Sequence, residues 1–386
     1  MNIKGRRIVS ALLSAVLILS GAATRLGSPR STNEAAVACA STDAVGTAVR
    51  IGGASSDDSV ILGSRIWDLL AKDARAANDD DGRIQLIVGG GVFGTRIKET
   101  HVAVSSADDG SVLKGGDRII SINGKEVSSI AEIREILSGC GGDTLNIVCK
   151  RGSRSVTLKC TPKSVGDEYR LGAVLREGSA GIGTITYVDP ETGEFGGLGH
   201  GICDAESGKI IDTSGGTVTD VILGGVVKGE SGKPGELSGI LTDRPMGEIY
   251  SNNECGVFGK LTSLPRGAAA TLMPIAHRNE VKAGAATILS TLKNGATMEY
   301  KVELSEIKSG SLGTKCFRVK VTDPALLAIS GGIVRGMSGS PIIQNGKLIG
   351  AVTHVLVDDP TSGYGIFIEN MLSASENARN ELPKSA

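Results

Sequence analysis

The sequence predicts a mainly β protein, and three observations lead to this prediction. Short runs of β-branched and aliphatic residues alternate with turn residues, and beyond Pro162 no amphipathic helix of ordinary length interrupts them. Glycine occupies 55 of 386 positions, twice its usual share of ~7%, and aromatic residues make up 3%. Because glycine reaches positive φ angles without a steric cost, this composition suits short strands joined by tight turns. Strands without intervening helices favour an antiparallel barrel or sandwich.

The N-terminus is predicted to carry an export signal or a membrane anchor over residues 1–25. Basic residues precede an uncharged run of 16 residues, 8–23, which is long for a signal-peptide core and short for a membrane span of ~20 residues. Because the basic residues come first, the bulk of the chain is expected outside the cytoplasm. A cleaved signal and a retained anchor both remain open. Residues 26–84, rich in Ser, Ala, Asp and Gly, are predicted to form a spacer.

Charge and cysteine content narrow the possible partners. The formal net charge is −1, so nothing in the composition attracts nucleic acid. The seven cysteines form no C-x-x-C pair, and an odd number leaves at least one outside any disulfide within a monomer. His200 and Cys203 lie close in sequence, but no second pair accompanies them to complete a zinc site. We therefore expect no metal and no organic cofactor.

The segment after the spacer shows an ordered pattern of strands and one helix. An apolar run over residues 113–127 turns at an Asn-Gly pair, residues 123–124, which favours a hairpin with a type I′ turn. Residues 129–138 then place four aliphatic side chains on one helical face, followed by a glycine. Two strand-like segments, 144–150 and 155–160, complete the pattern.

This order of elements resembles a PDZ domain, in which a Gly-Asp pair, here residues 116–117, opens a strand that ends in Asn-Gly. The resemblance covers residues 85–163 and implies a peptide-binding module, where a peptide adds as a strand beside a glycine-bearing loop. A glycine-rich stretch lies where that loop is expected. Its glycines are the predicted peptide-binding residues: Gly89, Gly90, Gly91 and Gly94. A purely structural or autoinhibitory module is the alternative.

The sharpest chemical signal is the hexapeptide at residues 336–341, Gly-Met-Ser-Gly-Ser-Pro. A serine between glycines can sit on a tight turn with its hydroxyl exposed, and nearby backbone N–H groups can form an oxyanion hole. Ser338 is therefore the predicted nucleophile, with the N–H groups of Gly336 and Ser338 as oxyanion-hole donors. The hexapeptide resembles the G-x-S-G-x-P turn of trypsin-like peptidases, although Ser340 replaces the more usual glycine. This resemblance implies a double β-barrel peptidase domain over residues 166–378.

A serine needs a general base to become nucleophilic near neutral pH, and the chain has four histidines. Glycines on both sides of His200 leave room for a substrate backbone to approach its imidazole, so His200 is the predicted base. His354, sixteen residues after Ser338, is the alternative base. His101 falls in the PDZ-like segment and His277 has no flanking glycines, so neither is favoured.

An acidic residue is expected to orient the imidazole and to stabilise its cation. Asp323 is the predicted residue, because the order His200, Asp323, Ser338 agrees with the order in trypsin-like peptidases. However, Asp323 lies only 15 residues before Ser338, which is closer than that resemblance leads us to expect. Three other acids remain open alternatives: Asp204, Asp243 and Asp358.

Longer strings resemble the stage IV sporulation protein B peptidase family of endospore-forming bacteria. The resemblance covers residues 85–375, with matching strings at residues 179–184, 197–200, 331–341, 353–354 and 359–365. Asp323 with its following proline also matches the position of that family's proposed acidic residue. The resemblance implies a self-processing serine endopeptidase that the forespore exports into the space between its two membranes. The implied partners are the peptidase itself and a regulator of an intramembrane metalloprotease, whose cleavage activates a mother-cell sigma factor.

Two other classes of function remain open. One is a non-catalytic PDZ-containing scaffold whose barrel has become a binding module, and it predicts no reaction of Ser338 with a fluorophosphonate probe. The other is a chaperone with secondary proteolysis, which predicts binding of unfolded proteins independent of His200. The glycine context of Ser338 and His200 favours a serine peptidase, and the uncharged N-terminal run after basic residues favours one that is membrane-anchored or secreted.

Overall fold

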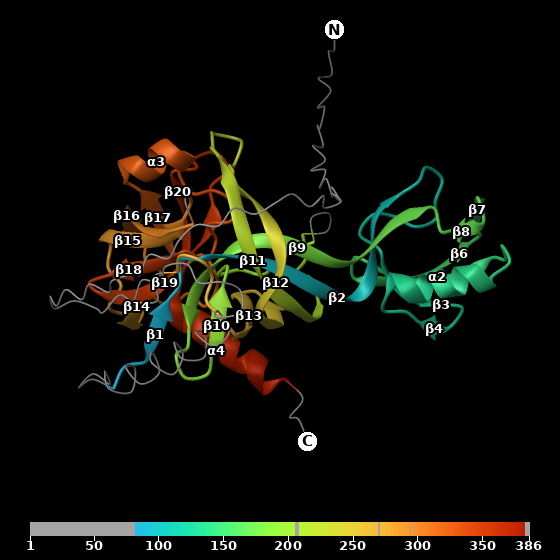
Figure 1. Ribbon diagram of the computed structural model, residues 1–386, viewed down its shortest axis with the longest axis horizontal. Coiled ribbons are helices and arrows are strands. Elements are labelled where there is room, and N and C mark those ends of the chain that lie inside the picture. Colours follow the sequence, from blue (N-terminus) through green and yellow to red (C-terminus); the bar gives the residue numbers. More distant parts are fainter. Residues whose placement is uncertain (1–81, 205–207, 269–270, 294, 383–386) are drawn as a thin grey trace, which may run out of the picture. The chain divides into compact units, whose positions relative to one another are not determined.

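The computed structural model describes residues 82–382 except 205–207, 269–270 and 294 (Figure 1). The predicted export signal or anchor and nearly all of the predicted spacer therefore lie outside the described residues. The described residues form mostly strands, as predicted, with three helices: α2 (Ile130–Gly139), α3 (Pro324–Ser330) and α4 (Ile368–Asn380). None of these described helices is long and apolar enough to cross a membrane.

Six antiparallel strands close into a first barrel. In the order of their pairing they are β9 (Ala173–Val188), β10 (Glu194–Gly197), β13 (Gly256–Leu261), β12 (Glu236–Asn253), β11 (Thr213–Val227) and β2 (Val92–Ala107), which pairs back with β9. Phe93 and Phe195 meet edge to face in the core, with ring centroids 5.7 Å apart. Two short strands, β1 (Gln85–Val88) and β14 (Thr271–Pro274), extend this sheet beyond β9.

A second barrel closes from six strands of the C-terminal half. In pairing order they are β15 (Gly284–Thr291), β16 (Thr297–Ser305), β17 (Phe317–Val321), β20 (Ser362–Phe367), β19 (Lys347–Val355) and β18 (Pro341–Gln344). Phe317 and Phe367 pack together in its core, with ring centroids 5.2 Å apart. Helix α4 packs against strands of both barrels, β12 and β19. Two closed antiparallel barrels in succession confirm the predicted fold class.

Along the chain, the PDZ-like part follows the barrel-forming half of β2 and precedes the barrel-forming half of β9. Its elements are the second half of β2, β3 (Arg118–Ile122), β4 (Lys125–Glu126), α2, β5 (Leu145–Arg151), β6 (Arg154–Cys160), β7 (Lys163–Val165), β8 (Glu168–Arg170) and the first half of β9. The predicted hairpin is confirmed, because Asn123 and Gly124 have the positive φ angles of a type I′ turn, 51° and 81°. Ser129 caps α2 in a capping box with Glu132.

The start of this part differs from the predicted range 85–163. Strand β1 pairs with β9 and β14, and residues 94–98 of β2 pair with β11, so residues 85–98 belong to the first barrel. Strands β2 and β9 are each a single run of 16 residues that serves the barrel at one end and the PDZ-like part at the other. The local sequence gives no signal for a domain boundary that lies within a continuous strand.

Candidate active site

Ser338 lies on a tight turn between α3 and β18. The Ser340 N–H donates to the Met337 carbonyl over 2.9 Å, and Gly339 has a φ of 94°. A type II turn has this hydrogen bond and requires a positive φ at its third residue. The turn therefore requires the glycine that directly follows Ser338.

Gly339 also leaves no room for a side chain. A Cβ at this position would lie 2.0 Å from the Thr184 carbonyl oxygen and 2.5 Å from the Leu198 amide nitrogen. We expect Gly339→Ala to lower the free energy of unfolding by about 2–4 kcal/mol, because both the φ angle and the close packing on β9 are lost. Unfolding in denaturant measures this loss.

Gly346→Ala is the matched control for that prediction. Gly346 also has a positive φ, 72°, but a Cβ added there meets no atom within 4 Å. Its replacement is expected to cost about 1 kcal/mol, from backbone strain alone. Equal losses in the two variants would contradict the packing argument for Gly339.

Two fully buried threonines of β9 hold the carbonyl groups of the Ser338 turn. The Thr184 N–H donates to the Ser338 carbonyl over 3.0 Å, and its hydroxyl donates to the Gly336 carbonyl over 2.8 Å. The Thr186 hydroxyl donates to the Gly339 carbonyl over 2.8 Å. The first barrel thus fixes a turn that belongs to the second barrel. Sequence reasoning missed both threonines, although polar residues alternating within an apolar strand are a signal that could have found them.

The predicted oxyanion-hole donors have no internal hydrogen-bond acceptor. Neither the Gly336 N–H nor the Ser338 N–H donates to any residue that the structure describes. The Met337 N–H, which lies between them, donates to the Val334 carbonyl over 3.1 Å. Two free N–H groups on the turn of the nucleophile are what an oxyanion hole requires. Their role in binding an oxyanion stays a prediction.

His200 follows a sharp reversal of the chain at the end of β10. Leu198 and Gly199 have φ angles of 66° and 68°, and a non-glycine residue such as Leu198 pays a free-energy cost there. The Leu198 N–H donates to the Thr184 carbonyl over 3.1 Å. Thr184 therefore contacts the serine turn through its N–H and the histidine loop through its carbonyl.

The ring nitrogens of His200 have distinct roles. Nδ1 lies 2.9 Å from the Gly201 carbonyl oxygen. A carbonyl oxygen only accepts hydrogen bonds, so Nδ1 carries the proton and Nε2 keeps its lone pair. Burial lowers the pKa of His200 from the ordinary value of 6.5, so the imidazole is neutral at pH 7. A neutral imidazole with a free Nε2 is the form that a general base needs.

One cavity of about 640 Å³ brings the predicted nucleophile and base together. Ser338, His200 and the alternative base His354 all line it. The imidazole rings of His200 and His354 lie 4.8 Å apart, centroid to centroid. The Ser338 hydroxyl donates to the Thr353 carbonyl over 2.8 Å rather than to an imidazole. Catalytic hydrogen bonds often tighten only in the substrate complex. Substrate binding must therefore rotate the Ser338 hydroxyl from the Thr353 carbonyl toward the imidazole.

His354 differs from His200 in its hydrogen bonding. Burial and the neighbouring His200, together with Lys315, lower the pKa of His354 to about 4. Its Nδ1 is buried without a hydrogen-bond partner among the described residues. A fixed tautomer is therefore shown for His200 and not for His354.

Asp323 is not one of the described residues that line this cavity. Its carboxylate accepts hydrogen bonds from the N–H groups of Ala325, Leu326 and Lys301 at 2.9–3.2 Å, and it caps the N-terminus of α3. In the described part of the chain no hydrogen bond or ion pair joins Asp323 to His200. The Gly201 carbonyl takes the place at Nδ1 that an orienting carboxylate would occupy. Asp323 as the orienting acid stays a prediction.

The alternative acids lie outside the cavity as well. Asp204 forms an ion pair with Arg176, and Asp243 forms one with Arg96. Within the described residues neither they nor Asp358 lines the cavity. Among the same residues, no group of three or more His, Cys, Asp or Glu side chains could hold a metal ion.

The predicted peptide-binding glycines lie in the first barrel rather than in the PDZ-like part. Gly90 donates its N–H to the Ile185 carbonyl, Gly91 accepts from the Ile185 N–H, and Gly94 pairs with strands on both sides of β2. A Cβ at Gly89 would lie 2.1 Å from the Ile185 carbonyl oxygen. Close packing on β9 thus explains glycine at this position. The expectation followed the PDZ order of elements, whereas this stretch belongs to the barrel.

An open strand edge in the PDZ-like part lies beside α2 instead. Residues 173–176 of β9 pair with β2 on one side, and no described strand pairs with their other side. Helix α2 packs there, and the Ile130 N–H donates to the Glu177 carboxylate over 2.6 Å. The N–H groups of Leu171 and Gly172, just before this edge, donate to no described residue. An open edge with free N–H groups at its start can capture a peptide C-terminus.

Taken together, two barrels that place a serine and a histidine in one cavity are an arrangement typical of serine peptidases. The family model of the SpoIVB peptidase S55 matches residues 167–372, which is more than half of the chain, and the PDZ domain model matches residues 105–151. The chain belongs to the SpoIVB peptidase S55 family. Ser338 and His200 both lie within the matched range.

Curated relatives match a smaller part of the chain. A Brucella suis protein described as a zinc metalloprotease is 31% identical over 106 residues, which cover 26% of this chain and 27% of that protein. A Mesorhizobium japonicum protein with the same description is 29% identical over 93 residues, which cover 23% of this chain and 25% of that protein. This chain spans about a quarter of the length of these relatives.

Solved structures show a distant likeness. The inactive form of the Rv3671c protease is 13% identical with a TM-score of 0.29, and the match covers 51% of this chain and 84% of that chain. The active form of the same protease, from M. tuberculosis, is 12% identical with a TM-score of 0.30 and covers 54% and 78%. Sequence identities and TM-scores this low do not allow site residues of that protease to be assigned to this chain.

Proposed function

We propose that this peptidase is an exported, self-processing endopeptidase of sporulation signalling. Membership of the SpoIVB peptidase S55 family supports the sporulation setting. The resemblance described above implies cleavage of a regulator of an intramembrane metalloprotease, which activates a mother-cell sigma factor. The basic residues before an uncharged N-terminal run support export, with the chain membrane-anchored or secreted.

The observation that carries the proposal is the shared cavity of Ser338 and His200. In this mechanism Nε2 of His200 takes the hydroxyl proton while Ser338 Oγ attacks the carbonyl carbon of a peptide bond. The Gly336 and Ser338 N–H groups hold the oxyanion, and the Gly201 carbonyl stabilises the imidazolium. His200 then gives the proton to the leaving amine, and water releases the acyl group from Ser338 by the reverse sequence.

Asp323→Asn separates two roles of the predicted acid. Asn caps a helix as well as Asp does, so this change preserves the N-cap of α3, and it removes the charge together with the oxygen that accepts from the Lys301 N–H. Loss of hydrolysis with unchanged stability would support Asp323 as the orienting acid. Unchanged hydrolysis would leave Asp323 as a helix cap.

N-terminal sequencing of the purified chain beside its Ser338→Ala variant tests self-processing. The wild-type chain is expected to show a new N-terminus that appears with time, and the variant is expected to stay intact. The same new N-terminus in both proteins would assign the cut to a contaminating protease and would contradict self-processing.

We also propose that the PDZ domain captures peptide C-termini along the open edge of β9. Gly172 has a φ of 68°, so Gly172→Ala is expected to turn the free N–H groups away and to weaken binding at least about tenfold. A hexapeptide library with free C-termini provides the ligand for this titration.

Two controls accompany this titration. The amidated library lacks the carboxylate and is expected not to bind. Gly166→Ala carries the same backbone change in the β7–β8 turn, where φ is 63° and a Cβ meets no atom within 4 Å. It is expected to bind the library like the wild type. Equal binding by the Gly172 variant would contradict this site.

A further inference from the structure

We infer that Asn370, on helix α4, is a positioning residue for one wall of the substrate cleft. It holds the loop Ser311–Cys316, whose middle residues face the cavity of Ser338 and His200. The inference rests on the proposed function, because it concerns how that cavity receives a peptide.

The loop lines the cavity through Gly313 and Thr314. The Thr353 hydroxyl donates to the Thr314 carbonyl over 2.8 Å, and the Thr353 carbonyl accepts the hydroxyl of Ser338 over 2.8 Å. One residue of β19 therefore contacts both the loop and the nucleophile. A displacement of the loop changes the width of the cleft directly beside the reacting atoms.

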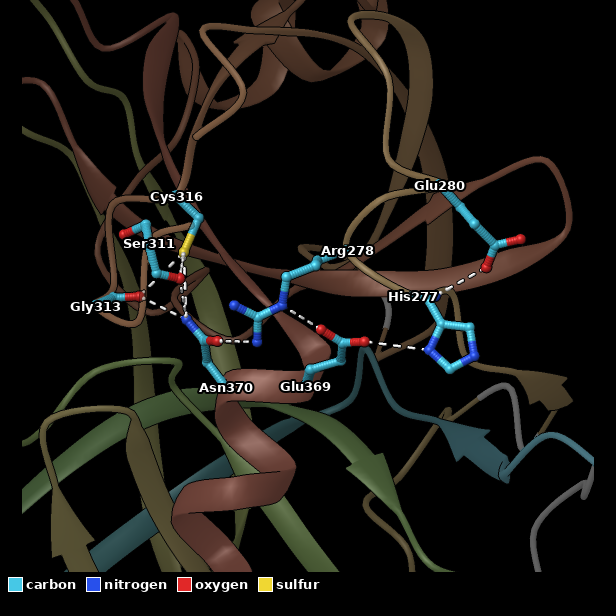
Figure 2. Close-up of polar contacts among 8 residues, drawn as sticks. All are labelled: His277, Arg278, Glu280, Ser311, Gly313, Cys316, Glu369 and Asn370. Carbon is cyan, nitrogen blue, oxygen red and sulfur yellow. Dashed lines mark hydrogen bonds and ion pairs between the residues drawn. The ribbon is translucent and has the colours of Figure 1, made fainter. Parts of the chain in front are cut away.

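Asn370 holds the loop from the side of α4, as Figure 2 shows. Its Nδ2 donates to the carbonyls of Ser311 and Gly313, at 3.1 Å each, and lies 3.4 Å from Cys316 Sγ. The side chain of Cys316 in turn donates to the Gly313 carbonyl over 3.1 Å. Asn370 is 5% exposed, so water cannot readily replace these hydrogen bonds.

The other end of the amide fixes its orientation. The Arg278 guanidinium donates to Asn370 Oδ1 over 3.0 Å and pairs with Glu369 (Figure 2). It also lies over the ring of Phe367. Because a guanidinium only donates and a carbonyl only accepts, Oδ1 must face Arg278 and Nδ2 must face the loop. The two N–H donors of Asn370 are therefore committed to the cleft wall.

Gly313 is the residue of this wall that carries no side chain. A Cβ added to Gly313 meets no atom within 4 Å. A residue that lines the cavity without a side chain leaves a substrate chain more room beside Ser338 than a larger residue would. We expect the wall to act on peptide binding more than on the chemistry of the serine.

Asn370→Asp tests this inference with almost no change in shape. The carboxylate still accepts from Arg278 but loses both N–H donors, and it sets a negative charge against two carbonyl oxygens. We expect KM for an oligopeptide substrate to rise about tenfold, because the wall is released. Both kcat and the rate at which a small fluorophosphonate labels Ser338 are expected to stay within about twofold, because the Thr353 carbonyl that holds the Ser338 hydroxyl belongs to β19 and not to the loop.

Glu376→Gln is the matched control on the same helix. Glu376 is exposed, and its side chain forms no hydrogen bond or ion pair with any residue that the structure describes. Its replacement is expected to leave KM within about twofold of the wild type. A rise in KM equal to that of the Asn370 variant would show a general effect of α4 and would overturn the inference.

Gly313→Val provides a second test that does not disturb α4. It adds a branched side chain to a residue that lines the cavity and is expected to raise KM for the peptide about tenfold with unchanged labelling. An unchanged KM in this variant, or in a folded Asn370→Asp protein, would overturn the inference. If the fluorophosphonate fails to label even the wild-type chain, the proposed function fails instead, so the two failures are distinguishable.

Discussion

Replacing Ser338 with alanine is expected to lower the rate of peptide hydrolysis by at least about 10⁴-fold while the chain stays folded. The hydroxyl makes one hydrogen bond, to the Thr353 carbonyl, and the turn is held by backbone groups that alanine keeps. Loss of activity without loss of stability is therefore the expected result. Hydrolysis of a fluorogenic peptide and unfolding in denaturant measure the two quantities.

Ser340→Ala is the matched control, because Ser340 lies two residues further along the same turn. Its hydroxyl is fully buried and has no hydrogen-bond partner among the described residues. Removing an unsatisfied buried hydroxyl is expected to leave hydrolysis unchanged and to leave stability equal or higher. Activity that survives in Ser338→Ala, or is lost equally in Ser340→Ala, would remove Ser338 from the mechanism.

Replacing His200 with asparagine is expected to lower kcat/KM by about 10⁴-fold. An asparagine amide can still donate to the Gly201 carbonyl, as Nδ1 does, but it offers no base in place of Nε2. The loss thus reports on proton transfer rather than on the shape of the loop. Hydrolysis of the same fluorogenic peptide gives the measurement.

The pH profile of the wild-type chain provides an independent view of His200. A general base must be neutral, so kcat/KM falls as pH decreases through the pKa of the base in the free enzyme. Burial lowers the pKa of His200, so the midpoint of this fall is expected below the ordinary value of 6.5. A midpoint above that value would contradict a buried imidazole as the base.

His354→Phe distinguishes the two histidines of the cavity. Phenylalanine preserves a ring beside His200 but accepts no proton, so kcat/KM is expected to stay within about threefold of the wild type. A loss as large as that of the His200 variant would instead identify His354 as the base.

Local features of the sequence predicted much of the fold. The Asn-Gly pair at 123–124 predicted a hairpin, and the aliphatic face over residues 129–138 predicted the helix α2. The alternation of short strands and turns predicted an antiparallel barrel or sandwich, and the resemblance to trypsin-like peptidases implied the double barrel. Each of these signals operates within about ten residues, so one sequence is enough to read it.

The parts that sequence reasoning missed depend on contacts between distant residues. Gly89 and its neighbours look like a carboxylate-binding loop, but they pack on β9, some 95 residues further along the chain. The support that Thr184 gives to Ser338 spans an even longer separation and crosses from one barrel to the other. Such pairings become visible only once the strands have been placed.

The sequence around Asp323 also contains a local signal for the start of a helix. An aspartate followed by proline and then by a helix is a typical N-cap, and the structure shows this arrangement at the start of α3. The family resemblance suggested a catalytic role for the same residue. Both roles are compatible with the sequence, which explains why a charge-removing variant is needed to separate them.

The most direct measurement is the mapping of a fluorophosphonate adduct on the wild-type chain by peptide mass spectrometry. An activated serine reacts with this probe, whereas an ordinary serine does not. We predict one adduct, on Ser338, formed at a rate that falls at acidic pH and is lost in His200→Asn. An adduct on another serine, or no adduct on a folded chain, would contradict a peptidase built on Ser338 and His200.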